Sequence, residues 1–160
     1  MIHINIICIG KIKEKFFRDA IDEYSKRLGK YCTLKINELP DEKIPNNASE
    51  KDFILIKEKE CNNILNYIKK DSYIICLDLK GKQFTSEEFS KKIENISLNY
   101  NSCITFIVGG SLGISEKILN ISNESISFSK MTFPHQLFRI FLLEQIYRAF
   151  KISNNEAYHK

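Results

Sequence analysis

The last part of the chain holds several side chains that could do acid–base or binding chemistry. His135 and Arg139 follow Pro134 and lie four residues apart, so they share one face near the start of a predicted helix. An imidazole exchanges its proton near neutral pH, and a guanidinium stays charged and offers forked hydrogen-bond donors. The pair is typical of proton handling or charge stabilisation, although a histidine at a helix start can equally bond a loop carbonyl.

Four more reactive side chains follow. Glu144 and Arg148 are also four residues apart, and the simpler interpretation of that spacing is an ion pair along the helix. Tyr158 and His159 directly precede the final residue, where chain ends are ordinarily frayed. Taken one at a time, structural roles explain these four residues better than catalysis does.

A glycine-rich stretch, IVGGSLG at residues 107–113, has features of a nucleotide-binding loop. Glycines allow backbone N–H groups to approach a ligand closely, and a helix is predicted soon afterwards. However, the spacing is GGxxG rather than GxGxxG, and the lysine–serine pair of a phosphate loop is missing. These differences argue against an NAD, FAD or ATP site and leave a tight turn about as well supported as a ligand loop.

Alternating strand and helix patterns must position these residues. Apolar runs and period-two alternation predict strands at residues 2–10, 33–39, 72–79, 102–110 and 125–129. Helices are predicted at residues 14–28, 49–69, 85–100 and 115–121 and from residue 134 onward, with a polar loop at 40–50 and a turn at 81–82. This order predicts one α/β domain, residues 1–160, with a largely parallel sheet. Ligands bind at the carboxyl ends of such strands, which here follow Leu77 and Val108 and surround residues 128–133.

The predicted closing helix is apolar on two sides. One side can cover the sheet, and the other most simply covers a second copy of the chain, so we expect a homodimer. A helix buried inside one larger core is the alternative.

Composition narrows the class of protein. The chain has 160 residues, 43% of them hydrophobic, and a formal net charge of +4, as in ordinary globular proteins. Lysine and arginine exceed acidic residues in 11–30 and 130–160, which suits either a polyanion-binding footprint or simply a solvated surface. Five cysteines without metal-ligand spacing indicate structural fillers in a reducing cytosol. Neither a signal peptide nor an apolar run of membrane-spanning length is found, so we expect a cytoplasmic protein without a membrane or metal partner.

Four segments together are more informative than any motif alone. In chain order they read IGKIKEKFFRDAIDEYSKRL, VGGSLG, SFSKMTFPHQLFRIFLLEQIYRAFKI and AYHK. This combination closely resembles the RlmH family, SPOUT-class methyltransferases that act on a pseudouridine of bacterial large-subunit (23S) ribosomal RNA. The resemblance covers the whole chain, and FSKMTFPHQ with the terminal YHK is its most specific part.

The resemblance implies a fold, a cofactor and its contacts. The fold would be a single-domain α/β-knot, in which the C-terminal segment threads a loop to form a trefoil knot. The methyl donor would be S-adenosyl-L-methionine, whose sulfonium methyl is already electrophilic and needs no metal, and the acceptor would be N3 of pseudouridine. The implied cofactor-binding residues are Leu77, Gly109, Phe128, Ser129, Lys130, Met131, Thr132 and Phe133.

With the resemblance, the closing residues gain candidate catalytic roles. We expect Arg139 to position the base or stabilise charge on it, and His135, Tyr158 and His159 to handle the proton or grip the nucleotide. The tail of one subunit would complete the site of its partner, and the assembled ribosome would help recognition. The competing hypotheses are a related enzyme with another base or ribose as target, a non-catalytic ribosome-binding factor, and a flavodoxin-like nucleotide binder.

Overall fold

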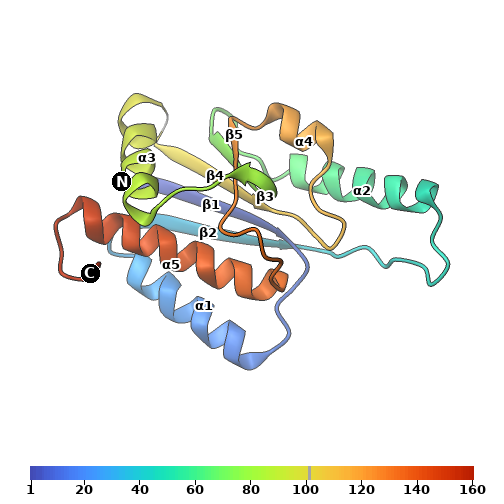
Figure 1. Ribbon diagram of the computed structural model, residues 1–160, viewed down its shortest axis with the longest axis horizontal. Coiled ribbons are helices and arrows are strands. Elements are labelled where there is room, and N and C mark those ends of the chain that lie inside the picture. Colours follow the sequence, from blue (N-terminus) through green and yellow to red (C-terminus); the bar gives the residue numbers. More distant parts are fainter. Residues whose placement is uncertain (101) are drawn as a thin grey trace.

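A five-stranded parallel sheet forms the centre of the computed structural model, which describes residues 1–100 and 102–160 (Figure 1). The strand order is β2-β1-β4-β3-β5, and every neighbouring pair is parallel. The strands are β1 (Ile2–Ile9), β2 (Cys32–Leu39), β3 (Tyr73–Lys82), β4 (Cys103–Val108) and β5 (Glu124–Ile126). The helices are α1 (Lys15–Leu28), α2 (Glu50–Leu65), α3 (Ser86–Asn99), α4 (Glu116–Ile121) and α5 (His135–Ser153). The predicted α/β class and parallel sheet are confirmed.

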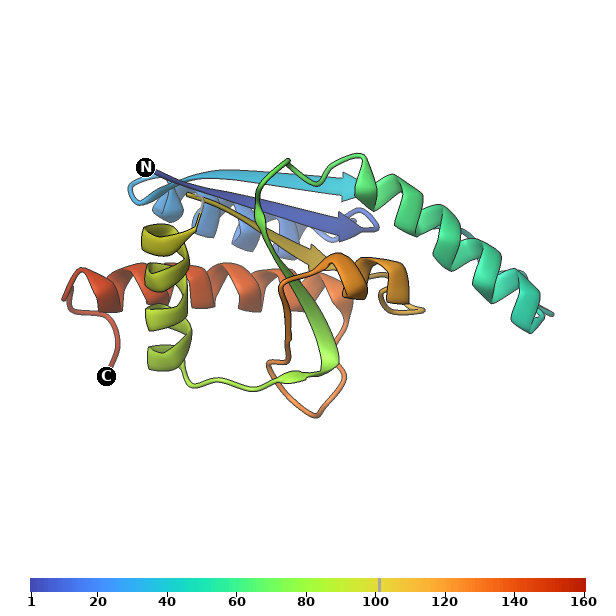
Figure 2. The same cartoon turned by 90° about the horizontal axis from the view of Figure 1, so that it is seen from above.

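Helices cover both faces of the sheet because the central strands are apolar on both sides. Along β1, Ile4, Ile6 and Cys8 pack into the core shared with α1, α3 and α5, while Ile7 and Ile9 pack under α2 and α4. Figure 2 shows α2 extending beyond the carboxyl ends of the strands. Those ends therefore lie between the two helical layers.

Local capping signals set the starts of two helices. Thr85 and Glu88 form the predicted reciprocal capping box at the start of α3. Ser49 and Asp52 do the same for α2, so this helix begins where the sequence indicates, although it ends at Leu65 rather than near residue 69. Side-chain oxygens here satisfy backbone N–H groups that a helix start leaves free.

The predicted turn at residues 81–82 is wrong, because β3 continues through it. Lys82 pairs with Ile126, and the amide of Ser127 donates to the Lys82 carbonyl at 3.0 Å. A Cβ atom at Gly81 would lie only 2.5 Å from the backbone carbonyl carbon of Ile126, so the two chain segments lie in close backbone contact. The last strand accordingly ends at Ile126 rather than at 129, and the chain leaves the sheet there.

All five cysteines are free, and four of them are buried. Burial raises the pKa of the thiols of Cys8, Cys32 and Cys76 to about 11, so they stay protonated and unreactive at neutral pH. The prediction that they act as apolar fillers is confirmed for these positions. Within residues 1–100 and 102–160, no helix has the length and apolar content needed to cross a membrane.

Candidate active site

A cavity of about 330 Å³ opens at the carboxyl ends of β3, β4 and β5. Its walls come from the three regions that the sequence predicts as ligand-binding, although residues 77–79 belong to β3 rather than to a loop, and from the start of α5. The lining residues are Leu77, Asp78, Leu79, Val108, Gly109, Gly110, Ser111, Leu112, Gly113, Ile114, Ile126, Ser127, Phe128, Thr132, Phe133, His135 and Phe138. The size and the mostly apolar lining suit a small organic ligand.

The glycine loop, residues 109–113, lines the cavity, and its first two residues, Gly109 and Gly110, have no room for a side chain. The amide of Gly113 donates to the Gly110 carbonyl at 3.0 Å, and Gly113 has a φ of 79°. A Cβ atom at Gly109 would lie 2.9 Å from the carbonyl carbon of Gly113. The loop is therefore a tight turn and also a ligand-accessible backbone, so the two interpretations left open by the sequence are compatible.

An aromatic wall closes the opposite side. The rings of Phe128 and Phe138 stack with centroids 6.1 Å apart, and Phe133 packs edge-on against Phe138 at 5.7 Å and Phe141 at 5.4 Å. Two hydrogen bonds hold the segment that carries Phe128 and Phe133. The Ser127 hydroxyl donates to the Ser129 carbonyl, and the Met131 amide donates to the Ser129 hydroxyl. This wall presents flat apolar surface to the cavity.

His135, the first residue of α5, lines the cavity and is half-buried. Burial lowers the pKa of its imidazole below the ordinary value of 6.5, and the positive charge of Arg139 lowers it further, against a smaller opposite effect of Asp41. The imidazole is consequently neutral at neutral pH. A neutral imidazole beside a ligand cavity can accept a proton.

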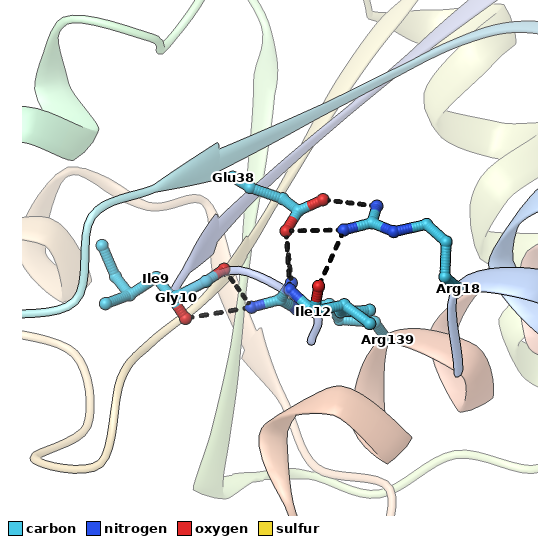
Figure 3. A network of polar contacts seen from close by, with 6 residues as sticks. All are labelled: Ile9, Gly10, Ile12, Arg18, Glu38 and Arg139. Atoms are coloured by element: carbon cyan, nitrogen blue, oxygen red, sulfur yellow. Dashed lines mark hydrogen bonds and ion pairs between the residues drawn. The ribbon is translucent and has the colours of Figure 1, made fainter. Parts of the chain in front are cut away.

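Arg139 lies one helical turn later but does not line the cavity. Its Nη2 donates to the carbonyls of Ile9 at 3.0 Å and Gly10 at 2.7 Å, just past the end of β1 (Figure 3). Its Nη1 lies 3.5 Å from Glu38 Oε2, and only 3% of the residue is exposed. Long-range packing thus holds the guanidinium at the carboxyl end of β1, outside the cavity lining, and its expected role toward a ligand stays a prediction.

The Glu38 carboxylate on β2 contacts three parts of the chain, namely the loop before α1, α1 itself and α5. It accepts from Arg18 Nη1 at 2.7 Å and from the amide of Ile12 at 2.8 Å (Figure 3). Burial alone would raise the pKa of the Glu38 carboxyl, but the hydrogen bonds from Arg18 and Ile12 outweigh it and lower the pKa. The network therefore ties the first turn of α5 to β2 and to the loop that leads into α1.

The C-terminal tail folds back on α5 and α3 of its own chain rather than fraying. Tyr158 donates to Glu144 Oε2 at 2.8 Å, and Arg148 Nη1 donates to His159 Nδ1 at 3.1 Å. His159 Nε2 lies 2.7 Å from Glu87 Oε1. The expected ion pair of Glu144 and Arg148 is present at 2.6 Å. Neither tail residue lines the cavity of the same chain.

The predicted cofactor residues divide into two groups. Leu77, Gly109, Phe128, Thr132 and Phe133 line the cavity. Ser129, Lys130 and Met131 do not line it. Ser129 lines a neighbouring cavity of about 280 Å³ instead. Met131 is 72% exposed, and Lys130 is exposed next to it.

Several lining residues are missed by sequence reasoning. Phe138 and Ile126 lie in an apolar helix and strand, where an apolar residue reads as core. Asp78 and Leu79 follow Leu77 directly, so the rule that ligands sit beyond strand ends is the signal that could have found them. Among the described residues, no cluster of three or more histidine, cysteine, aspartate or glutamate side chains is arranged to hold a metal ion.

Comparison with known proteins agrees with this geometry. A family model described as predicted SPOUT methyltransferase matches residues 2–159. Two proteins from different strains of Clostridium botulinum, both named ribosomal RNA large subunit methyltransferase H, are 63% identical over 158 residues, which is 99% of either chain. A solved structure of a probable methylase family protein from Haemophilus influenzae superposes with a TM-score of 0.52 at 13% identity, covering 95% of this chain and 66% of that one. This structural likeness concerns the fold.

Proposed function

The chain belongs to the SPOUT methyltransferase family, and on that premise we propose that it methylates N3 of a pseudouridine in the 23S ribosomal RNA of the bacterial large subunit, with S-adenosyl-L-methionine as methyl donor. The observation that supports this most strongly is sequence similarity along almost the whole chain. Relatives named ribosomal RNA large subunit methyltransferase H are 63% identical over 99% of it. The cavity at the ends of β3, β4 and β5 supports it independently.

The cavity fits the donor in both shape and chemistry. Leu77, Phe128 and Phe138 offer apolar walls for a flat adenine, and the glycines of the loop let backbone groups approach the ligand. When bound, S-adenosyl-L-methionine supplies an electrophilic methyl group on its sulfonium. The protein must then align the acceptor nitrogen and help to remove its proton.

We assign to His135 the role of accepting the N3 proton of the pseudouridine. It lines the cavity, and its lowered pKa keeps the imidazole neutral and able to accept the N3 proton at neutral pH. Arg139 is then a positioning residue rather than a catalytic one, because its hydrogen bonds to Ile9 and Gly10 fix the first turn of α5.

We further propose a homodimer in which the tail of one subunit completes the catalytic site of its partner, on the side of the RNA acceptor rather than of the methyl donor. Two observations support this. Tyr158 and His159 are ordered by hydrogen bonds yet do not line the cavity of their own chain. In addition, Leu137, Phe138 and Phe141 of α5 stay only partly buried within one chain. Gel filtration with light scattering measures the mass directly, and a monomer at micromolar concentration contradicts this part of the proposal.

The RNA surface is proposed on the basis of charge. Lys11, Lys13, Lys15, Lys26, Arg27 and Lys30 are exposed on α1 and the residues flanking it. Arg18 lies on the same helix and pairs with Glu38 at 2.7 Å. Such cations contact phosphates without reading sequence, so recognition of one pseudouridine would need the folded RNA of the ribosome, in the cytoplasm.

The trefoil knot also belongs to the proposal. The close contact of Gly81 with Ile126 is compatible with it, because the extension of β3 lies against the backbone at the point where the chain leaves β5. SPOUT membership supports it as well.

Mass spectrometry of 23S ribosomal RNA tests the function. RNA from a strain lacking the gene should lack one N3-methylated pseudouridine, and the restored gene should return it. A missing methyl group on another base or on a ribose would support a different target. Unchanged methylation, together with ribosome binding by the protein, would support a non-catalytic binding factor.

A further inference from the structure

Glu60, near the end of α2, is a buried carboxyl group that the proposed reaction does not use. Only 4% of the residue is exposed. Its helix neighbours Cys61 and Ile64 pack into the apolar core on the α2 and α4 side of the sheet. Isolated carboxylates are seldom buried this far, so the position calls for a physical explanation.

The carboxyl group packs against the glycine loop of the donor cavity. A Cβ atom at Gly110 would lie 3.0 Å from Glu60 Oε2 and 3.4 Å from Oε1, and also 3.0 Å from Ile9 Cγ2. Gly110 itself lines the cavity. Glu60 therefore touches the back of the loop whose front faces the donor.

Two acidic residues of the loop after β2 lie near the same carboxyl group. Burial raises the pKa of Glu60 to about 7, and the negative charges of Asp41 and Glu42 contribute further. The amide of Glu42 hydrogen-bonds the carboxylate and Lys57 attracts it, and both oppose the rise. The glycine loop contributes no ionisable side chain at this contact. Glu60 is thus poised to change charge near neutral pH.

We infer that Glu60 is a positioning residue of the donor site, which braces the glycine loop from behind and, when ionised, favours a cationic sulfonium donor over its neutral thioether product. This inference rests on the proposed function, since it takes S-adenosyl-L-methionine as the donor. Methyl transfer removes the positive charge from the sulfur. A carboxylate behind the loop attracts the donor and not the product, and so assists exchange of one for the other.

The sign of the linkage follows from the charges. The ionised form of Glu60 binds the sulfonium better, so donor affinity rises as pH rises through about 7 and falls as Glu60 is protonated. The product S-adenosyl-L-homocysteine carries the same amino-acid end without the sulfonium charge. A pH dependence seen in the affinities of both molecules therefore comes from other groups. A pH dependence of the ratio of the two affinities reports on a carboxylate near the sulfur.

Calorimetric titration of both molecules into the intact protein tests the inference. For the unmodified protein, we expect the ratio of donor to product affinity to rise about fivefold between about pH 6 and pH 8. Glu60→Gln keeps the shape of the side chain and removes the charge, so the ratio should become independent of pH. Glu58→Gln, an exposed glutamate on the same helix, should behave like the unmodified protein.

A second variant keeps the test decisive if Glu60→Gln does not fold. Asp41→Asn removes one negative neighbour, lowers the pKa of Glu60 and should move the midpoint of the change to lower pH.

Two failures are distinguishable. A ratio that keeps its pH dependence in Glu60→Gln, or has none in the unmodified protein, overturns the role of Glu60. No binding of the donor at any pH overturns the proposed function itself.

Discussion

The two halves of α5 carry similar side chains in different surroundings. In the first half, Arg139 is 3% exposed and bonded to carbonyls at the end of β1. In the second half, 25% of the Arg148 side chain is exposed, and it pairs with Glu144 on the same helix. The histidines beside the two halves differ too: His135 begins the helix in the cavity wall, whereas His159 of the tail contacts Arg148 and Glu87 of α3. Burial and distant partners, rather than residue type, decide what each side chain does.

Of all the changes proposed here, removing the tail should reduce methylation the most. It should leave the affinity for the methyl donor almost unchanged. Deletion of residues 157–160 should abolish methylation, because the proposed partner contribution is lost. Donor affinity should stay within about threefold, since Tyr158 and His159 do not line the cavity of their own chain. Single-turnover methylation and calorimetry measure the two quantities. An active truncated enzyme would contradict the shared site.

The two arginines should differ strongly in their contribution to stability. Arg139→Ala leaves the partly buried Glu38 without one of its partners and two backbone carbonyls without a donor, and should lower the free energy of unfolding by about 2–3 kcal/mol. Arg148→Ala removes a partly exposed pair and should cost about 0.5 kcal/mol. Urea denaturation measures both. Equal losses would show that burial does not separate the two halves of the helix.

His135 should affect the chemical step more than the binding of the donor. His135→Asn should lower kcat about 10²-fold or more, as expected for loss of a general base. His3→Asn, an exposed histidine at the other end of the chain, is the matched control.

The pH profile of the unmodified enzyme sharpens this assignment. Because burial lowers the pKa of His135, the neutral base persists below pH 6.5, and kcat should fall only as the pH drops through the lowered pKa. The acidic limb should disappear in His135→Asn. Its persistence in that variant would assign the proton to another group.

The smallest effect should come from one hydroxyl group in the tail. Tyr158→Phe removes the hydrogen bond to Glu144 and should reduce the free energy of unfolding by about 1 kcal/mol. Tyr100→Phe, at a tyrosine that is 64% exposed, should change it by less. If both variants are equal, the folded-back tail contributes nothing to stability.

Much of the donor site was predictable because the rules involved are local or depend only on strand order. Period-two and helical patterns located all ten elements, and the capping box at Thr85 set the start of α3. Parallel strands place their carboxyl ends at one edge, which brings Leu77, Gly109 and Phe128 together. The terminal motifs added the family, and with it the donor.

The tertiary structure alone decided the roles that depend on distant partners. Periodicity places Arg139 on a helix face but cannot show that carbonyls about 130 positions earlier accept from it. It also reads Gly81 as a turn, although close packing against Ile126 is what requires a glycine there. The partner of Tyr158 and the burial of Glu60 behind Gly110 are likewise matters of packing. A sequence pattern describes the environment along one element, whereas these contacts join elements that meet only when the chain has folded.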